Sequence, residues 1–405
     1  PPTAHLSSPS VAVLQMDFWG NDEEYAYLGS GLTEEIVIAL TRFPEFVVIG
    51  PLNRAQLRRK HLEPRGIGQE YGVRFVLDGA VRAHGQSLRI TAKLTDALNG
   101  HQLWGQAHDY DLETSTIKQI DDELVGQVVA TIADAYGIIP RALTKESMAQ
   151  RNDSLSEYEA ILRYYHSFYV LTPDAHAEAS EALQRTLERD PNNAMAAGML
   201  GDLVASTYQY GYVDSETLLD QAEELGHRAV ALDPNCQPAR FTMALIHFLR
   251  FQRRQFISEA EKCIGLNPNH ALNCAALALH LYMAGERVRG VELIERVMRL
   301  NPHHPGWYHL IPYMEAYRQG DYETALIEAH RFNIPVFHYD PIIRVAVLGQ
   351  LGHQEEANQA IDELLALVPD FRTRGRSLIR RYAYLDEHVD MLLEGLRKAG
   401  LTVED

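Results

Sequence analysis

One short pattern returns at a nearly constant interval along the second part of the chain. LNPNH starts at Leu266 and LNPHH at Leu300, thirty-four residues later, and RDPNN, LDPNC and LVPDF are related copies. The prolines at these junctions are separated by 43, 34, 34, 33 and 34 residues, and they are Pro191, Pro234, Pro268, Pro302, Pro335 and Pro369. Proline ends a helix because it has no N–H, and a neighbouring Asn or Asp supplies turn and cap oxygens. A period of 34 residues is typical of a unit of two antiparallel helices and a turn.

The segments between these prolines carry a matching helical pattern. In MAGERVRGVELIERVMRLNPHH, Gly285 marks a turn, and the apolar residues after it return at helical spacing. Gly320 and Gly352 occupy the same position in the next two units. The small residues that would let paired helices approach closely are Ala222, Ala325 and Ala357. The second unit is longer by nine residues, which we place in the loop Thr207–Thr217. The pattern predicts an α-solenoid, in which each helix pair packs on its neighbours.

The front of the chain follows a different pattern, in which short apolar runs alternate with helical ones. We expect strands at 11–18, 45–50, 73–83, 87–95 and 101–111, and helices at 32–43, 53–72 (broken at Pro64) and 114–136. We also expect Thr33 to be the N-cap of the first helix. The last helix has an apolar stripe that would cover the sheet or pair across a dimer axis: Ile117, Ile120, Leu124, Val128, Ile132 and Tyr136. The order βαβαβββα predicts a mixed sheet with helices on one or both faces.

Both regions resemble known families. The repeats resemble the tetratricopeptide repeat (TPR) family, with about six units between Ser154 and Phe371. GSGLTEEIVIALTRFPEFVVIG and IGQEYGVRFVLDGAVRAHGQSLRITAKLTDALNGHQLWGQAHDYDLE resemble the TolB amino-terminal-like domain, which in bacteria often precedes TPR arrays. The loop LQMDFWGNDEEYAYLGSG departs from the Pro-Phe and Asn-Leu-Ser start that is usual there. PGWYHLIPYMEAYRQGDYETAL resembles TPR regions attached to bacterial class III adenylate or guanylate cyclases, and similar regions follow CadC-like winged-helix regulators.

Pattern and resemblance together predict an α/β N-terminal domain followed by an all-α TPR superhelical solenoid. The expected organisation is a linker at 1–10, a TolB-like domain at 11–137, a linker at 138–153, the TPR array at 154–371, and a C-terminal capping helix and tail at 372–405. The opening PPTAHLSSPS reads as the end of a linker, so we expect a longer parent polypeptide.

Composition argues against several kinds of partner. The net charge is −18; residues 1–150 carry 13 basic and 19 acidic residues, and residues 151–405 carry 24 and 36. Since both parts are acidic, neither offers the field that a phosphate backbone needs, and we expect no contact with nucleic acid. The basic run Asn53–Arg65 is better explained as a solvated helix face. No apolar run is long enough to span a membrane. The three cysteines, expected in the core, are Cys236, Cys263 and Cys274.

Searching for chemistry in the sequence yields no catalytic motif. LGSGLTEE ends in two glutamates that would repel an anion at the helix start, and GIGQEYG does not follow a strand as a dinucleotide fingerprint would. The histidines around Trp307, which are His303, His304 and His309, more simply face water at a repeat junction than bind zinc. We therefore expect no enzyme activity, no cofactor and no metal within this chain.

Resemblance to TPR units implies a concave groove lined by the first helix of each pair. Carrying the family's groove positions onto this sequence identifies the candidate partner-binding residues Tyr164, Phe168, Phe241, Phe248, Tyr282, Trp307, Tyr317 and Arg318. Aromatic residues together with arginine commonly anchor peptide interfaces. The expected ligand is a protein or peptide; alternatives for the same surface are a homodimer, an autoinhibitory contact with the front domain, or simple packing against neighbouring helices.

These expectations describe a non-catalytic regulatory module of a bacterial signalling protein. By resemblance, its effector is a class III adenylate cyclase; the alternative is a CadC-like transcription regulator. A second alternative is a small-molecule sensor with ligand between the α/β domain and the solenoid. We expect a cytoplasmic location, or a periplasmic one if the parent has a membrane span upstream.

Overall fold

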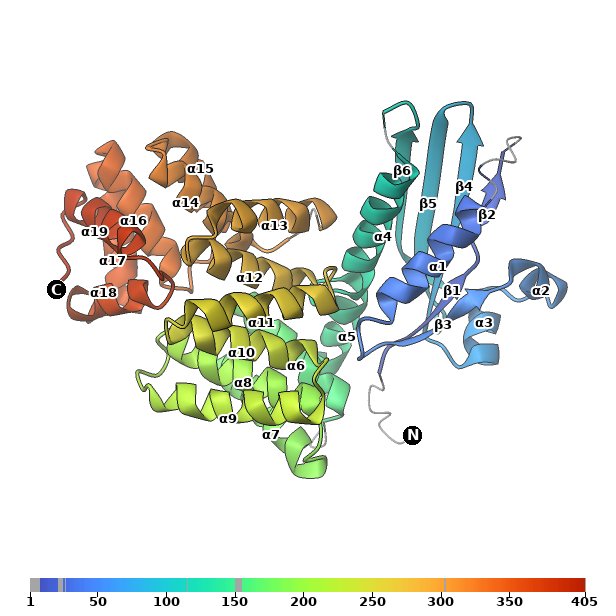
Figure 1. Cartoon of the computed structure of the whole chain (residues 1–405), viewed down its shortest axis with the longest axis horizontal. Helices are drawn as coiled ribbons and strands as arrows, with labels where there is room; N and C mark the ends of the chain where they lie inside the picture. The colour runs from blue at the N-terminus through green and yellow to red at the C-terminus, as the bar shows by residue number, and fades with distance from the viewer. Residues whose placement is uncertain are drawn as a thin grey trace. The chain divides into compact units, whose positions relative to one another are not determined.

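The computed structural model describes residues 8–20, 25, 27–114, 116–149, 155–301 and 304–404. The chain divides into two compact units, one of residues 1–162 with 267–271 and the other of residues 163–266 with 272–405. The predicted fold class is confirmed, since a mixed sheet with helices is followed by helices alone (Figure 1). The domain boundaries given above remain a proposal.

Among the described residues, six strands form one sheet in the order β3-β1-β4-β5-β6, with β2 also paired to β4. β1 is parallel to β3 and β4, whereas β4, β5 and β6 form an antiparallel meander. The strands are β1 (Ser10–Leu14), β2 (Asp17–Trp19), β3 (Val47–Leu52), β4 (Phe75–His84), β5 (Ser87–Asp96) and β6 (His101–Asp111). The expected first strand is thus two strands. The predicted alternation along β5 is confirmed, because Leu88, Ile90, Ala92 and Leu94 are all buried.

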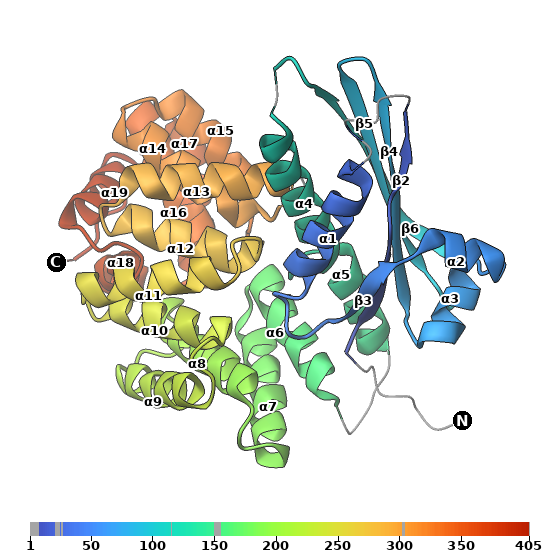
Figure 2. The same cartoon turned by 45° about the vertical axis from the view of Figure 1, so that its right-hand side comes forward.

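Helices cover both faces of the sheet. Figures 1 and 2 show α1 (Leu28–Leu40) and α4 (Ile117–Ala133) on one face, and α2 (Arg54–Arg59) and α3 (Pro64–Tyr71) on the other. Burial on both sides explains why β1 is apolar from Val11 to Leu14 rather than alternating. The apolar stripe of α4 lies mostly in the core, so packing within this unit accounts for it.

Two local expectations for the front unit were wrong. Thr33 does not cap α1, because the helix already begins at Leu28. Its buried hydroxyl instead donates to Gly29 O (2.6 Å) and accepts from Met16 N (3.0 Å), which ties the helix to the chain after β1. The expected linker at 138–153 contains a helix, α5 (Ile138–Ala149), whose Ile139 and Leu143 are buried.

From α6 onward the described residues form six helix pairs. These are α6 (Glu157–Val170) with α7 (Pro173–Arg189), α8 (Ala194–Gln209) with α9 (Thr217–Leu232), α10 (Gln237–Leu249) with α11 (Arg253–Leu266), α12 (Ala271–Met283) with α13 (Arg287–Leu300), η2 and α14 (Gly306–His309, Leu310–Arg318) with α15 (Tyr322–Phe332), and α16 (Tyr339–Leu351) with α17 (Gln354–Leu367). The turn glycines Gly285, Gly320 and Gly352 have φ of 90°, 77° and 75°, which other residues rarely adopt. Residues 210–216 separate α8 from α9, so the predicted loop holds only part of the nine extra residues of the second unit. The rest lengthen α8 and α9, which have 16 residues each, whereas α10 and α11 have 13 and 14.

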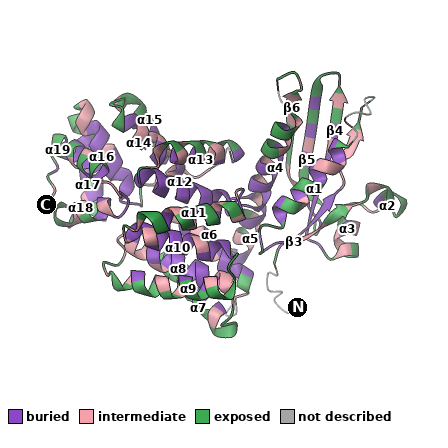
Figure 3. Ribbon diagram, viewed as in Figure 1, coloured by how far each residue is buried: buried purple, intermediate pink, exposed green. Residues whose placement is uncertain are grey.

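Within the solenoid, buried residues concentrate where helices face one another, while the outward sides of α9 and α13 are exposed (Figure 3). The C-terminal segment forms two helices rather than the expected single cap, α18 (Phe371–Arg380) and α19 (Asp386–Lys398). α19 lies against α16 so closely that a Cβ on Gly349 would be 2.2 Å from Gly395 O. Val389, Leu392 and Leu396 of α19 are buried in this contact region.

Candidate functional site

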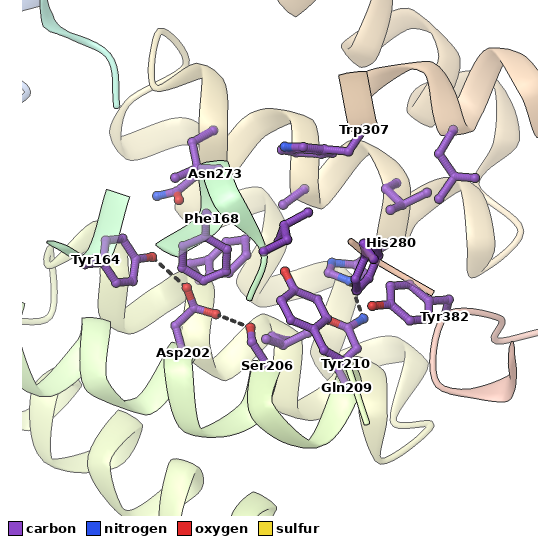
Figure 4. Close-up of a pocket in the computed structure, with 18 of the residues that line it drawn as sticks. Tyr164, Phe168, Asp202, Ser206, Gln209, Tyr210, Asn273, His280, Trp307 and Tyr382 are labelled. Atoms are coloured by element: carbon purple, nitrogen blue, oxygen red, sulfur yellow. Dashed lines mark hydrogen bonds between the residues drawn. The ribbon is translucent and has the colours of Figure 1, made fainter. Parts of the chain in front are cut away.

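A cavity of about 70 Å³ lies inside the solenoid, mainly among the first helices of its pairs (Figure 4). We call it the aromatic cavity. Its lining residues are Tyr164, Phe168, Leu171, Asp202, Ser206, Gln209, Tyr210, Phe241, Leu245, Leu272, Asn273, Ala276, Leu279, His280, Trp307, Leu310, Phe332, Phe337 and Tyr382. Most of them lie on or directly after α6, α8, α10, α12, η2 and α14. Phe332 at the end of α15, Phe337 after α15 and Tyr382 after α18 complete the lining.

Four of the eight candidate residues line this cavity: Tyr164, Phe168, Phe241 and Trp307. Tyr164 and Phe168 are one turn apart on α6, with ring centroids 5.0 Å apart in an edge-on arrangement. Trp307 is partly exposed at the start of its helix, and its ring lies 4.4 Å from that of Tyr308. The structure therefore brings together aromatic residues from the first, third and fifth pairs.

Phe248 does not reach the aromatic cavity. Its ring packs on His280 at 4.5 Å and on Phe256 at 5.4 Å, and it lines a separate cavity of about 380 Å³. That second cavity also contains Arg376, Arg380 and Arg381 from the end of the chain.

Tyr282, Tyr317 and Arg318 are also absent from the lining of the aromatic cavity. Tyr282 and Tyr317 join helices to one another instead, and Arg318 pairs with Glu315 on its own helix, α14. The hydroxyl of Tyr282 donates to Glu315 Oε2 (2.9 Å), and Arg318 Nη2 donates to Glu315 Oε1 (2.6 Å). The hydrogen bond from Arg318, together with those from Gln319 and Tyr282, lowers the pKa of Glu315 to about 2. The Tyr317 hydroxyl lies 3.2 Å from Met391 O, so α19 covers the side where a groove was expected. The groove positions of the TPR family could not predict this contact, because α19 lies outside the repeats.

Asp202 supplies the negative charge of the aromatic cavity. Its carboxylate accepts hydrogen bonds from the hydroxyls of Tyr164 (2.6 Å) and Ser206 (3.1 Å) (Figure 4). Burial raises the pKa of Asp202 to about 7, and the two hydrogen bonds oppose this rise. Sequence reasoning missed this residue, although a lone carboxylate in the apolar helix GMLGDLVAS was a signal that could have identified it.

Other polar groups that sequence reasoning missed come from α8, α12 and the segment after α18. Gln209 Nε2 lies 3.0 Å from His280 Nε2. Burial lowers the pKa of His280 to about 3, so this imidazole is neutral at physiological pH. The Tyr382 side chain is 4% exposed, and its hydroxyl has no hydrogen-bond partner in the described part of the chain. The aromatic cavity thus combines apolar walls with a few polar groups.

We expect Tyr164→Phe to lower the free energy of unfolding by about 1–3 kcal/mol, because it removes a hydrogen bond to a buried carboxylate. Urea denaturation would measure the change. The matched control is Tyr169→Phe on the same helix, where the side chain is exposed and the expected change is within about 0.5 kcal/mol. Equal effects of the two substitutions would contradict this role for Tyr164.

Among the described residues, no group of three or more His, Cys, Asp or Glu is placed to hold a metal ion. His303 lies outside the described residues; His304 stacks on Tyr308, and His309 Nδ1 is 2.6 Å from Glu328 Oε2. The three cysteines are buried, as expected. No helix in the described ranges combines the length and apolar character that crossing a bilayer requires.

Fold and site together define a two-part protein, in which an α/β unit with a mixed sheet precedes a solenoid of helix pairs that encloses an aromatic cavity. No family model matches the chain. The chain is 30% identical over 264 residues to "Putative adenylate cyclase 3" of Rhizobium meliloti, a match that covers 64% of this chain and 43% of that protein. The chain therefore spans less than half the length of the curated relative it matches.

Solved structures overlap separate parts of the chain. YrrB, described as "a TPR protein with an unusual peptide-binding site", is 15% identical, covers 47% of this chain and 94% of its own, and gives a TM-score of 0.31. TolB from Acinetobacter baumannii is 16% identical, covers 36% of this chain and 30% of its own, and gives a TM-score of 0.23. At such scores these likenesses carry no inference about function.

Proposed function

We propose that this chain is a regulatory region of a bacterial class III nucleotide cyclase and that its solenoid binds a protein or peptide partner. The similarity to "Putative adenylate cyclase 3" carries the proposal, because it extends over 264 residues of this chain. It favours a cyclase over a winged-helix regulator as the effector. In this proposal the catalytic domain belongs to another part of the polypeptide, and the chain itself contributes recognition in the cytoplasm rather than catalysis.

Support for partner binding comes from the aromatic cavity. Tyr164, Phe168, Phe241 and Trp307 converge there from three helix pairs. Large aromatic side chains in a partly enclosed pocket are the residues that most often dominate binding energy. Trp307 is the best placed for a partner, because it is partly exposed whereas the other three are buried.

The proposal is tested on the intact native polypeptide. Its mass should exceed the 45.7 kDa of this chain, and deleting residues 11–404 should change the cyclase rate about 5-fold or more, the size of typical coupling between sites. A native mass near 45.7 kDa would overturn the proposal. So would a cyclase rate that is the same with and without the region.

Trp307→Ala in that intact polypeptide should change the cyclase rate at least about 5-fold, in the same direction as the deletion. Truncating an interface anchor costs 1 kcal/mol or more of binding free energy. Tyr317 is not a suitable partner substitution, because its buried hydroxyl bonds to backbone and its loss would disturb the fold. Trp19→Ala is the control, since Trp19 is 58% exposed on β2 and lies outside the solenoid. If both variants have wild-type rates while the deletion does not, the regulatory surface lies elsewhere.

A further inference from the structure

Among the described residues that line the aromatic cavity, Asp202 is the one carboxylate, and none is Lys or Arg. Asp202 is 2% exposed, and no salt bridge joins it to a cation in the described part of the chain. A carboxylate held by two hydroxyl donors retains lone pairs that can accept further hydrogen bonds. A buried negative charge without a counter-ion is costly, and an incoming cation would relieve that cost.

The walls of the cavity suit a cation better than they suit a neutral or anionic guest. Aromatic rings from α6, α10 and η2 surround the space, among them Phe168, Phe241 and Trp307. The face of an aromatic ring carries partial negative charge and attracts an ammonium group placed over it. The remaining lining is apolar, so it would accept the carbon skeleton that bears the ammonium.

A second polar group belongs to the same cavity. The Tyr382 hydroxyl lies in the lining without a hydrogen-bond partner in the described residues, although the side chain is more than nine-tenths buried. Figure 4 shows the Tyr382 ring and the Asp202 carboxylate on opposite sides of the lining side chains. Buried polar atoms of native proteins are nearly always hydrogen-bonded, so this unpartnered hydroxyl is consistent with a cavity that admits a guest or water.

We infer that the aromatic cavity binds an ammonium group on a short apolar stem, with the ammonium against Asp202 and the stem against the aromatic rings. The size of the cavity fits a group of a few non-hydrogen atoms. Two sources present this chemistry, a free small amine and the lysine side chain of a polypeptide. The inference rests on the proposed binding role of the solenoid, but not on the identity of the effector.

Three probes, titrated by calorimetry into the full chain, separate these cases. They are n-butylammonium, N-acetyl-lysine methylamide and 1-butanol, the last being the neutral counterpart of the first. We expect the two ammonium probes to bind at least tenfold more tightly than 1-butanol. Tighter binding of n-butylammonium assigns the cavity to a free amine, and binding of the blocked lysine at least as tight assigns it to a polypeptide side chain.

Asp202→Asn tests the role of the charge. It keeps an acceptor for the Tyr164 hydroxyl while removing the negative charge, and it should weaken n-butylammonium binding at least tenfold. Glu315→Gln is the matched control, since it removes one negative charge from the same solenoid outside the cavity lining and should leave binding unchanged. Equal affinity of wild type and Asp202→Asn, or 1-butanol binding as tightly as n-butylammonium, would overturn the inference.

A pH series on the wild-type chain tests the same charge without any substitution. It therefore does not depend on a variant that folds correctly. Asp202 faces the hydroxyls of Tyr164 on α6 and Ser206 on its own helix, and His280 on α12 stays neutral above pH 5. With a pKa of about 7 for Asp202, its ionised fraction rises about tenfold from pH 6 to pH 8. The affinity for n-butylammonium should rise by the same factor, whereas an unchanged or falling affinity would contradict the inference. None of these measurements involves the cyclase, so this inference and the proposed function can fail separately.

Discussion

Replacing Gly349 by alanine should lower the free energy of unfolding by about 3 kcal/mol, a large effect for a single added methyl group. Gly349 of α16 faces Gly395 of α19, and a Cβ there would lie 2.2 Å from Gly395 O and 2.7 Å from Ala399 N. Both are backbone atoms of a helix, so no rotamer change can relieve the overlap. The helices must separate, and the contact that covers Tyr317 is lost with them.

Gly265→Ala in α11 is the matched control for this substitution. A Cβ on Gly265 meets nothing within 4 Å, so alanine there should stabilise the helix by about 0.5–1 kcal/mol. Urea denaturation measures both variants, and limited proteolysis shows whether α19 is released first. A Gly349→Ala protein as stable as wild type would show that α19 does not pack as described.

Acidification should destabilise the solenoid by about 3–4 kcal/mol between pH 7.5 and pH 5.5. Within the unit of residues 163–266 and 272–405, burial lowers the pKa of His280 to about 3 and that of His176, His338 and His388 to about 4. The unfolded chain takes up protons on these residues below its pKa of about 6.5, whereas the folded chain does not until about pH 4. Stability is therefore present above pH 6.5 and is lost as the pH falls toward 4.

The sign for Asp202 is opposite. Its folded pKa of about 7 lies above the unfolded value of 3.8, so the folded chain gains a proton first as the pH falls. Each histidine costs about 1.4 kcal/mol at pH 5.5 relative to pH 7.5, and Asp202 offsets about 2 kcal/mol of the total. The net effect of acidification is therefore a lower free energy of unfolding.

His176→Phe should reduce this acid sensitivity by about 1.4 kcal/mol, because it retains a ring among Phe168, Tyr210 and Tyr212 while removing the titrating group. Urea midpoints at the two pH values give the comparison. His227→Gln, at an exposed position, should keep the wild-type pH dependence. A stability that does not vary with pH, or that varies equally in His176→Phe and wild type, would show that these histidines are not neutral in the folded chain.

Features that depend on neighbours in the chain were predictable from the sequence. The proline period located the helix pairs, and the turn glycines Gly285, Gly320 and Gly352 have the left-handed conformation expected of them. Alternation along β5 marked its buried face. In each case the signal is local, because a helix turn, a strand pleat or a positive φ constrains the residue type directly.

Part of the candidate site could also be predicted from the sequence. The family positions led to Tyr164, Phe168, Phe241 and Trp307, which meet in the aromatic cavity. The same positions led to Tyr317, which α19 covers through a contact 74 residues away in the chain. A periodic pattern within one repeat gives no information about where a helix from a distant part of the chain will pack.

The sequence by itself determined the repeat, the helix pairs, the meander and the aromatic character of the first helices, since these follow from local spacing and turn chemistry. Only the tertiary structure decided that Thr33 would bond Met16 rather than cap a helix, that Gly349 would meet Gly395, and which aromatic rings would share a cavity with Asp202. These outcomes depend on how closely whole elements approach one another. That distance is set by the packing of many side chains at once rather than by any one residue and its neighbours in the chain.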